Sequence, residues 1–145
     1  MQLTEGSFGD RCNGRMNHQL TIAVHPEVFG ICRLEPNADI PVWANGKFLA
    51  TSRTQQELSV VCAEAGIPKG MTAERGRRLL QVEGILPFSL TGVLAAIAAP
   101  LAEAQVSIFA VSTYDTDYLL VSEADLERAI QVLETAGHAI RRIEP

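Results

Sequence analysis

The segment Val106–Val121 reads VSIFAVSTYDTDYLLV, with two apolar runs on either side of a polar cluster that extends from Ser112 to Asp117. β-Branched and aromatic side chains fit a pleated sheet, whereas Ser, Thr and Asp bond locally to the backbone of turns. The pattern predicts a β-hairpin with strands at 106–112 and 117–122. Its polar tip would expose the carboxylates of Asp115 and Asp117 for recognition.

An earlier part of the chain repeats this pattern. Phe48–Val61, FLATSRTQQELSVV, aligns without a gap on Ile108–Val121 at an offset of 60 residues, which places Glu57 on Asp117. We interpret the match as an internal duplication. Chance alignment of apolar runs is the alternative explanation, because 47% of the residues are apolar.

The sequence around the second hairpin predicts a complete α+β unit. The expected elements are a strand at Arg77–Ile85, a loop at Pro87–Gly92, a helix at Val93–Ala104, the hairpin, a second helix capped by Ser122 with Asp125 and ended by Gly137, and a closing strand at His138–Ile143. Both helices carry apolar residues at helical spacing, and Pro100 should kink the first by removing one hydrogen bond. The order β-α-β-β-α-β is ferredoxin-like, with both helices on one face of an antiparallel sheet.

The first half of the chain predicts a degenerate version of the same unit. Its expected strands are Leu20–Val24 and Phe29–Leu34, followed by a hairpin made of Lys47–Thr54 and Leu58–Glu64. The segment Ala65–Gly76 contains Gly66, Pro68 and Gly70, which rule out a regular helix. We therefore expect a mobile N-terminal arm at residues 1–17, with Met16 as an alternative start to Met1, a degenerate unit at 18–75 and a complete unit at 76–145.

Composition excludes several classes of protein. The net charge is −5 and no basic run occurs, so we expect no nucleic acid partner. No apolar stretch reaches the roughly 20 residues of a membrane helix, and the N-terminus lacks a signal-peptide pattern. The 3 cysteines have no C-x-x-C spacing and the 3 histidines have no metal-binding pattern, so we expect no disulfide, no metal and no cofactor. The default localisation is the cytoplasm.

Three motifs together resemble a known family. PFSLTG at Pro87–Gly92, STYDTDYLLV at Ser112–Val121 and SRTQQELSVVCAE at Ser52–Glu64 are similar to ACT-domain proteins of the CASTOR type. These are small bacterial double-ACT proteins related to the eukaryotic arginine sensor and to aspartokinase regulatory domains. The resemblance covers about Leu20 to Ile143. It implies two ACT-like units joined edge to edge, a homodimer, amino acid ligands held at unit interfaces beside the loop that precedes the first helix, and no catalysis.

The chemistry of the same residues is consistent with an amino acid ligand. The N-terminus of the helix at 93–104 offers unpaired N–H groups to a carboxylate, and Gly92 permits close approach. Ser89 and Thr91 can add hydroxyl bonds, while Asp115 or Asp117 can pair with an ammonium group. The candidate ligand-binding residues are Phe88, Ser89, Leu90, Thr91, Gly92, Ser112, Thr113, Tyr114, Asp115 and Asp117.

Each of these candidates has a structural alternative. Ser89 or Thr91 can simply cap the helix, and Asp115 can simply close the hairpin. Glu57 is expected to form a local ion pair with Arg53 instead of contacting a ligand. No nucleophile, base and electrostatic stabiliser come together, so we assign no catalytic residue. The favoured function is an amino acid sensor, which can also have a regulated protein partner; a ligand-free interaction module and a small ferredoxin-like enzyme are the competing interpretations.

Overall fold

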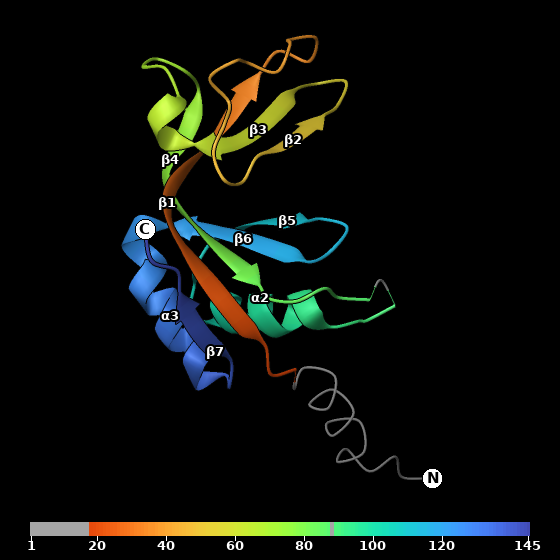
Figure 1. The fold of residues 1–145 in the computed structure, drawn as a ribbon, viewed down its shortest axis with the longest axis vertical. Helices are drawn as coiled ribbons and strands as arrows, with labels where there is room; N and C mark the ends of the chain where they lie inside the picture. The colour runs from red at the N-terminus through yellow and green to blue at the C-terminus, as the bar shows by residue number, and fades with distance from the viewer. Residues whose placement is uncertain (1–17, 88) are drawn as a thin grey trace.

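The computed structural model describes residues 18–145 apart from Phe88 (Figure 1). The predicted start sites and the predicted arm at 1–17 lie outside the described residues. The elements are β1 (Thr21–Leu34), β2 (Ala50–Arg53), β3 (Leu58–Ala63), the 3-10 turn η1 (Glu64–Gly66), β4 (Ala73–Val82), α2 (Val93–Glu103), β5 (Ile108–Ser112), β6 (Asp117–Ser122), the 3-10 turn η2 (Glu123–Asp125), α3 (Leu126–Thr135) and β7 (Ala139–Arg142). This arrangement has the predicted α+β class, and the absence of an α-helix between Ala65 and Gly76 is confirmed within the described residues.

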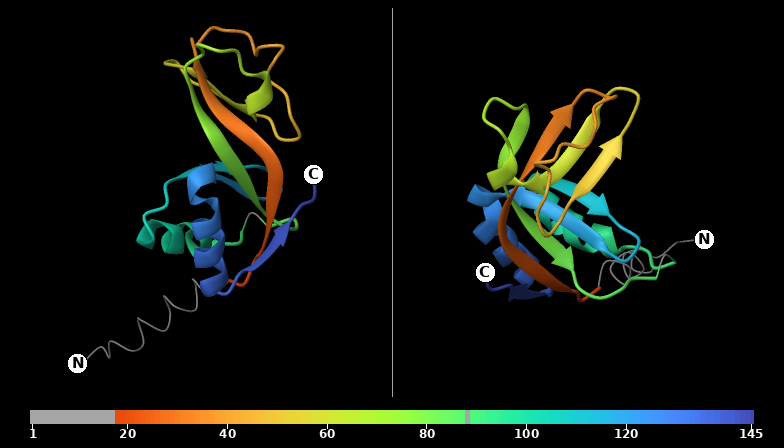
Figure 2. Two further views of the ribbon diagram at one scale, coloured as in Figure 1. Left: turned by 90° about the vertical axis from the view of Figure 1, so that its left-hand side faces the viewer. Right: turned by 45° about the horizontal axis from the view of Figure 1, so that its top comes forward.

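A single curled sheet carries both halves of the chain. Its strand order is β2-β3-β1-β4-β6-β5, and β7 pairs with the opening residues of β1. We call β2, β3 and the adjoining ends of β1 and β4 the first half of the sheet, and β5, β6, β7 and the other ends of β1 and β4 the second half. Figures 1 and 2 show β1 and β4 running through both halves as a long central pair, and in Figure 1 the β2–β3 hairpin lies beside its upper part and the β5–β6 hairpin beside its lower part.

β1 is one continuous strand, and the prediction of two short strands was wrong. Its pairing with β4 shifts register between Val24 and Val28 and again between Phe29 and Ile31. Pro26 lies in the first irregular stretch and has no N–H to donate to the ladder. A bulge absorbs such an interruption by bending the strand, so that β1 passes from one half to the other without ending.

The closing strand differs from a simple ferredoxin-like unit. In that arrangement β7 would lie beside β4, but β7 instead pairs in parallel with Thr21–Val24 of β1, which lies between them. β4 begins at Ala73, before the predicted start at Arg77, and crosses the predicted boundary between residues 75 and 76. The division of the chain into a degenerate unit at 18–75 and a complete unit at 76–145 stays a prediction.

Three apolar clusters fill the two faces of the sheet. The largest packs α2 and α3 against the second half, with Ile97, Leu101 and Leu133 almost fully buried. A second cluster lies under the 35–49 segment of the first half and includes Cys32 and Cys62. The third consists of Phe29, Val61, Leu79 and Leu120, with Phe48 and Tyr118 packed on it; it joins the inner faces of the two halves, and the rings of Phe48 and Tyr118 lie 4.5 Å apart.

Helix ends depart from the predicted capping. Neither helix has a side-chain hydrogen bond from its N-cap residue: Gly92 precedes α2 and Asp125 precedes α3. Ser122 instead precedes η2, where its side chain forms no cap either, so the predicted capping box was wrong. The 3-10 turn places three residues between the β6 strand end and α3, which moves Ser122 out of reach of the helix. Among the described residues, neither helix is long and apolar enough to cross a membrane.

Candidate functional site

A cavity of about 220 Å³ lies between the loop that follows β4 and the tip of the β5–β6 hairpin. We call it the hairpin pocket. It is lined by Leu86, Pro87, Leu90, Val93, Ser112, Thr113, Tyr114, Asp115, Thr116 and Asp117. Residues predicted from two separate motifs, Leu90 and the hairpin residues, thus come together on one hollow.

The remaining predicted residues lie elsewhere. Ser89, Thr91 and Gly92 belong to the neighbouring loop but are not among the described residues that line the pocket, and Phe88 lies outside the described residues. The backbone carbonyl of Thr91 accepts a hydrogen bond from Nε2 of His18 at 2.9 Å. That contact fixes the loop immediately before α2. Ligand contact by these residues stays a prediction.

The hairpin tip is built by two threonines. The Thr113 N–H donates to the carbonyl of Thr116 at 2.9 Å, and the Thr113 hydroxyl donates to the same carbonyl at 3.0 Å. The buried hydroxyl of Thr116 in turn donates to the carbonyl of Val82 at 2.7 Å, which ties the tip to the end of β4. A further bond, from the Leu86 N–H to the carbonyl of Asp115 at 2.8 Å, joins the loop to the hairpin. The pocket walls are therefore held in place by the chain itself.

Sequence reasoning missed Leu86, Pro87, Val93 and Thr116 as lining residues. Pro87 and Thr116 lie inside the two motifs that the prediction used, so their positions alone could have included them. Leu86 and Val93 flank the loop and look like ordinary core residues in the sequence. Their role depends on the long-range approach of loop and hairpin, which no local pattern reports.

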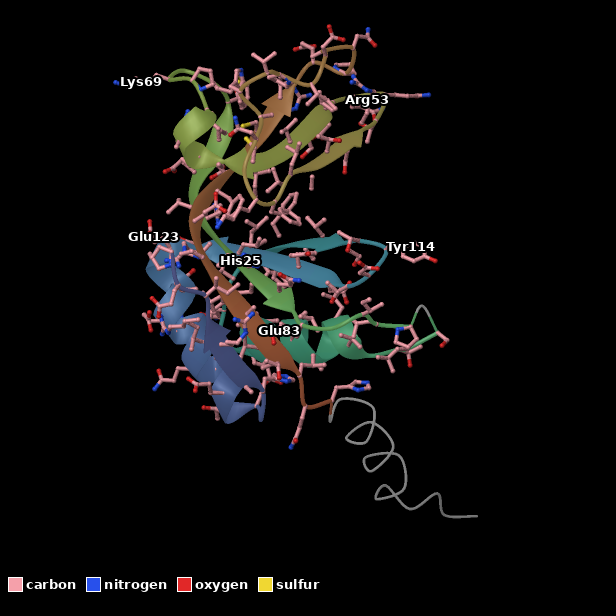
Figure 3. The ribbon with its side chains drawn as sticks, viewed as in Figure 1. His25, Arg53, Lys69, Glu83, Tyr114 and Glu123 are labelled. Atoms are coloured by element: carbon pink, nitrogen blue, oxygen red, sulfur yellow. The ribbon has the colours of Figure 1, made fainter. Side chains whose placement is uncertain are left out.

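Two carboxylates give the hairpin pocket a negative character. Asp117 is partly buried, and its Oδ1 accepts a hydrogen bond from the Ser112 hydroxyl at 2.6 Å. Asp115 and Tyr114 are exposed, and Figure 3 shows Tyr114 projecting outward from the hairpin tip. No Lys, Arg or His is among the described lining residues, so the pocket favours a ligand that carries positive charge.

The opposite wall is the start of a helix. Gly92 has a φ of 82°, in the left-handed region that favours glycine, and it turns the chain directly into α2. The first N–H groups of a helix have no partner within the helix, and the helix dipole adds partial positive charge at this end. Val93, in this first turn, lines the pocket. The start of α2 therefore borders the same hollow as the two carboxylates, through Val93.

The first hairpin repeats the tip geometry at a different offset from the predicted one. The Thr54 N–H donates to the carbonyl of Glu57 at 2.8 Å, as Thr113 does to Thr116. The structural offset is therefore 59 residues, and the counterpart of Asp117 is Leu58 instead of Glu57. The predicted Arg53–Glu57 ion pair was also wrong, because the Arg53 guanidinium donates to the backbone carbonyls of Pro36 and Ala38.

Reactive side chains do not gather at the site. Cys32 and Cys62 are buried in the first half as free thiols, and burial raises the pKa of Cys62 to about 11 and also raises the pKa of Cys32. A protonated, buried thiol is a poor nucleophile. Within residues 18–145 without Phe88, no group of three or more His, Cys, Asp or Glu side chains is arranged to hold a metal ion.

Comparison with known proteins places this geometry in context. A family model described as an ACT domain matches residues 72–135, and a second model, of an N-terminal domain, matches residues 27–70. The crystal structure of protein Atu0741 from Agobacterium tumefaciens is 33% identical, with a TM-score of 0.83 over 88% of this chain and 96% of that chain. The regulatory subunit of aspartate kinase from Thermus flavus is 11% identical, with a TM-score of 0.59 over 82% of this chain and 99% of that chain, which shows a common fold.

A curated relative carries the same signal at lower coverage. The cytosolic arginine sensor for mTORC1 subunit 1 of Mus musculus is 28% identical over 119 residues, which are 72% of this chain and 34% of that protein. The chain thus spans about a third of the length of this relative. Residues 72–135, from β4 to α3, therefore form an ACT domain, and the chain as a whole is 33% identical to a protein that it covers almost completely.

Proposed function

We propose that this protein binds an amino acid in the hairpin pocket and that binding regulates its association with itself or with a protein partner. The observation that carries the proposal is that Asp115 and Asp117 line the same cavity as Val93, the first residue of α2. A free amino acid presents an ammonium group and a carboxylate a few ångströms apart. The two walls offer the matching groups for both ends.

The ligand's charges determine its expected orientation. Its carboxylate would accept hydrogen bonds from the first-turn N–H groups of α2, while its ammonium group would pair with Asp117, whose second oxygen is not used by Ser112. Two carboxylates against one helix terminus leave the pocket net negative. A basic amino acid is therefore favoured over an acidic one.

Regulation would follow from the difference in affinity between two arrangements of the protein. A ligand shifts such an equilibrium only by that difference. Ile85, Leu90 and Tyr114 have large, exposed hydrophobic side chains, and each lines the pocket or directly precedes a residue that does. A second copy of the chain that covered these side chains would enclose the ligand. We propose a cytoplasmic homodimer without catalytic activity, in keeping with relatives that are regulatory domains.

A ligand-free interaction module is the second candidate, and one observation favours it. The hydroxyls of Ser112, Thr113 and Thr116 are already used in hydrogen bonds within the hairpin. A tip that satisfies its own polar groups can persist as a stable scaffold without any ligand. The exposed apolar side chains would then serve protein contact alone.

Thermal unfolding against each of the twenty amino acids separates the two candidates. A ligand at one hundred times its dissociation constant adds about 2.7 kcal/mol, which raises the midpoint by about 5 to 11 °C for a chain of this size. We expect a selective rise with one or a few amino acids, and loss of that rise in Asp117→Asn but not in Glu123→Gln, which changes an exposed carboxylate on η2. A flat panel with the wild-type protein would reject the sensor and favour the module.

A further inference from the structure

A second hollow, of about 300 Å³, lies between the two halves of the sheet. Residues of β1, β3 and β4 and the segments next to them form most of its wall, and Phe109 of β5 is the lining residue from the other half. We call it the inter-half pocket. Its volume is at the lower end of the range for small-molecule sites, and such sites often occur where two units meet.

The floor of the inter-half pocket is apolar. Ile31 pairs with Val61 on β3 and with Glu74 on β4, and it packs on the cluster that joins the two halves. Phe109 pairs with Leu120 of that same cluster yet remains 37% exposed. An aromatic ring that is left open to a hollow, beside a packed apolar cluster, offers a surface for an apolar ligand body.

Glu57 supplies an uncompensated charge at the rim of this hollow. The residue is half-buried, and among the described residues its carboxylate forms no hydrogen bond or ion pair. Its expected partner Arg53 is committed to backbone carbonyls on the other side of the hairpin. Partial removal of a carboxylate from water without a partner costs free energy, and a cationic ligand would recover that cost.

The other polar residues of the rim add specificity. Glu74 pairs with Arg77 at 3.3 Å, and Arg33 donates to the carbonyl of Gln56 at 3.1 Å. Glu74 and Arg33 line the inter-half pocket, together with Ser59 and Thr72. Arg77 compensates the charge of Glu74, so Glu57 is the unpaired carboxylate of the rim that can bind an ammonium group, and Arg33 can accommodate a carboxylate beside it.

We propose that the inter-half pocket is a second binding site, for a small molecule that carries a primary ammonium group on an apolar body. The ammonium group binds Glu57, and the apolar body lies against Ile31 and Phe109. Free amines and apolar amino acids share this chemistry. The site is separate from the hairpin pocket, because the two share no lining residue.

β5 connects the two sites. Phe109 lies near its start and lines the inter-half pocket, whereas Ser112 is its last residue and lines the hairpin pocket. A ligand that holds Phe109 against the first half would restrict the hairpin on which the other site is built.

Three probes test the proposal by amide chemical shifts of the full chain. They are 2-phenylethylammonium, L-phenylalanine and 3-phenylpropionate. The first carries only an ammonium group, the second an ammonium group and a carboxylate, and the third only a carboxylate. We expect the first to bind, with shifts at Ser59, Thr72 and Phe109, and the third to be silent. Tighter binding of L-phenylalanine than of the amine would identify amino acids as the source of the ligand, and weaker binding would identify amines.

Variants separate this site from the hairpin pocket. Glu57→Gln should weaken 2-phenylethylammonium binding by about tenfold or more, because it removes a charge-assisted hydrogen bond. Glu123→Gln is the matched control for one lost negative charge, and Asp117→Asn, which tests the hairpin pocket, should leave amine affinity within about twofold. Equal affinity in Glu57→Gln and wild type, shifts confined to residues 86–117 without Phe109, or no binding of any probe would overturn the proposal. Loss of the hairpin site alone would leave it standing.

Discussion

The hydrogen bonds of the His138 side chain can be tested together with the effect of Pro100 on α2. The buried imidazole of His138 accepts a bond from the Leu20 N–H on Nδ1 at 3.1 Å, and its Nε2 lies 3.0 Å from the carbonyl of Ala96. Because Nδ1 is the acceptor, Nε2 carries the hydrogen and donates to Ala96. That carbonyl would normally accept from the residue four positions later, which is Pro100 and has no N–H. The imidazole therefore replaces the bond that the proline removes from α2.

The replacement His138→Phe keeps a planar ring but removes both bonds. Each bond contributes about 0.5–1.5 kcal/mol net, and a buried group left unpaired costs about 1–3 kcal/mol. We expect the variant to lose about 2–4 kcal/mol of unfolding free energy in urea titrations followed by far-UV circular dichroism. His25→Phe is the matched control. Its Nε2 lies 2.8 Å from the side chain of Gln81, which can turn to solvent, so its loss should stay below about 1 kcal/mol.

Pro100→Ala completes a double-mutant cycle. The new N–H at position 100 can donate to Ala96, so this substitution should recover about 1–2 kcal/mol more in the His138→Phe background than in the wild type. Coupling of this size requires that both residues serve the same carbonyl. Additive effects within about 0.5 kcal/mol would refute the reasoning, because independent sites behave in that way.

Three further predictions concern stability. Thr116→Val removes the buried hydroxyl bond to the carbonyl of Val82 and should cost about 1–3 kcal/mol in urea unfolding, whereas an unchanged midpoint would show that the bond contributes nothing. Gly92→Ala places a side chain at a φ of 82° and should cost about 1–2 kcal/mol by the same measurement, with no loss expected only if the backbone relaxes out of that region. Because burial raises the pKa of Cys62 to about 11, the unfolded chain loses this proton first as pH rises, so stability should fall between about pH 9 and 11. Cys62→Val should flatten that fall, and an identical pH profile in both proteins would contradict the prediction.

Local patterns predicted the elements, because each depends on neighbours in sequence. The hairpin at 108–122 follows from alternating apolar residues around a Ser/Thr/Asp tip, and α3 follows from apolar residues at helical spacing. The same reasoning brought the two motifs of the hairpin pocket to attention, although only the fold brings them together. Leu86 and Val93 became lining residues through tertiary approach alone.

The local sequence pattern could not predict which distant segments pair with each other. The parallel contact between β7 and Thr21–Val24 joins residues more than one hundred positions apart, and nothing in either strand specifies the partner. The sequence predicted that a first strand ends at Val24, yet the ladder resumes at Val28 because the flanking residues still bury their side chains. The bond from His138 to Ala96 is of the same kind: the proline predicted a missing bond in α2, but not the residue that replaces it.

The corrected offset between the hairpins explains how two similar hairpins can line two different pockets. Asp117 opens β6 and lines the hairpin pocket, while its structural counterpart Leu58 opens β3 and is buried in the outer cluster of the first half. Successive residues of a strand face opposite sides, so the carboxylate of Glu57, one position earlier, points away from that cluster and lines the inter-half pocket. The two carboxylates differ by one position in structural register and therefore lie on opposite faces of the sheet. The carboxylate of the first hairpin therefore lines the inter-half pocket instead of a pocket at the hairpin tip.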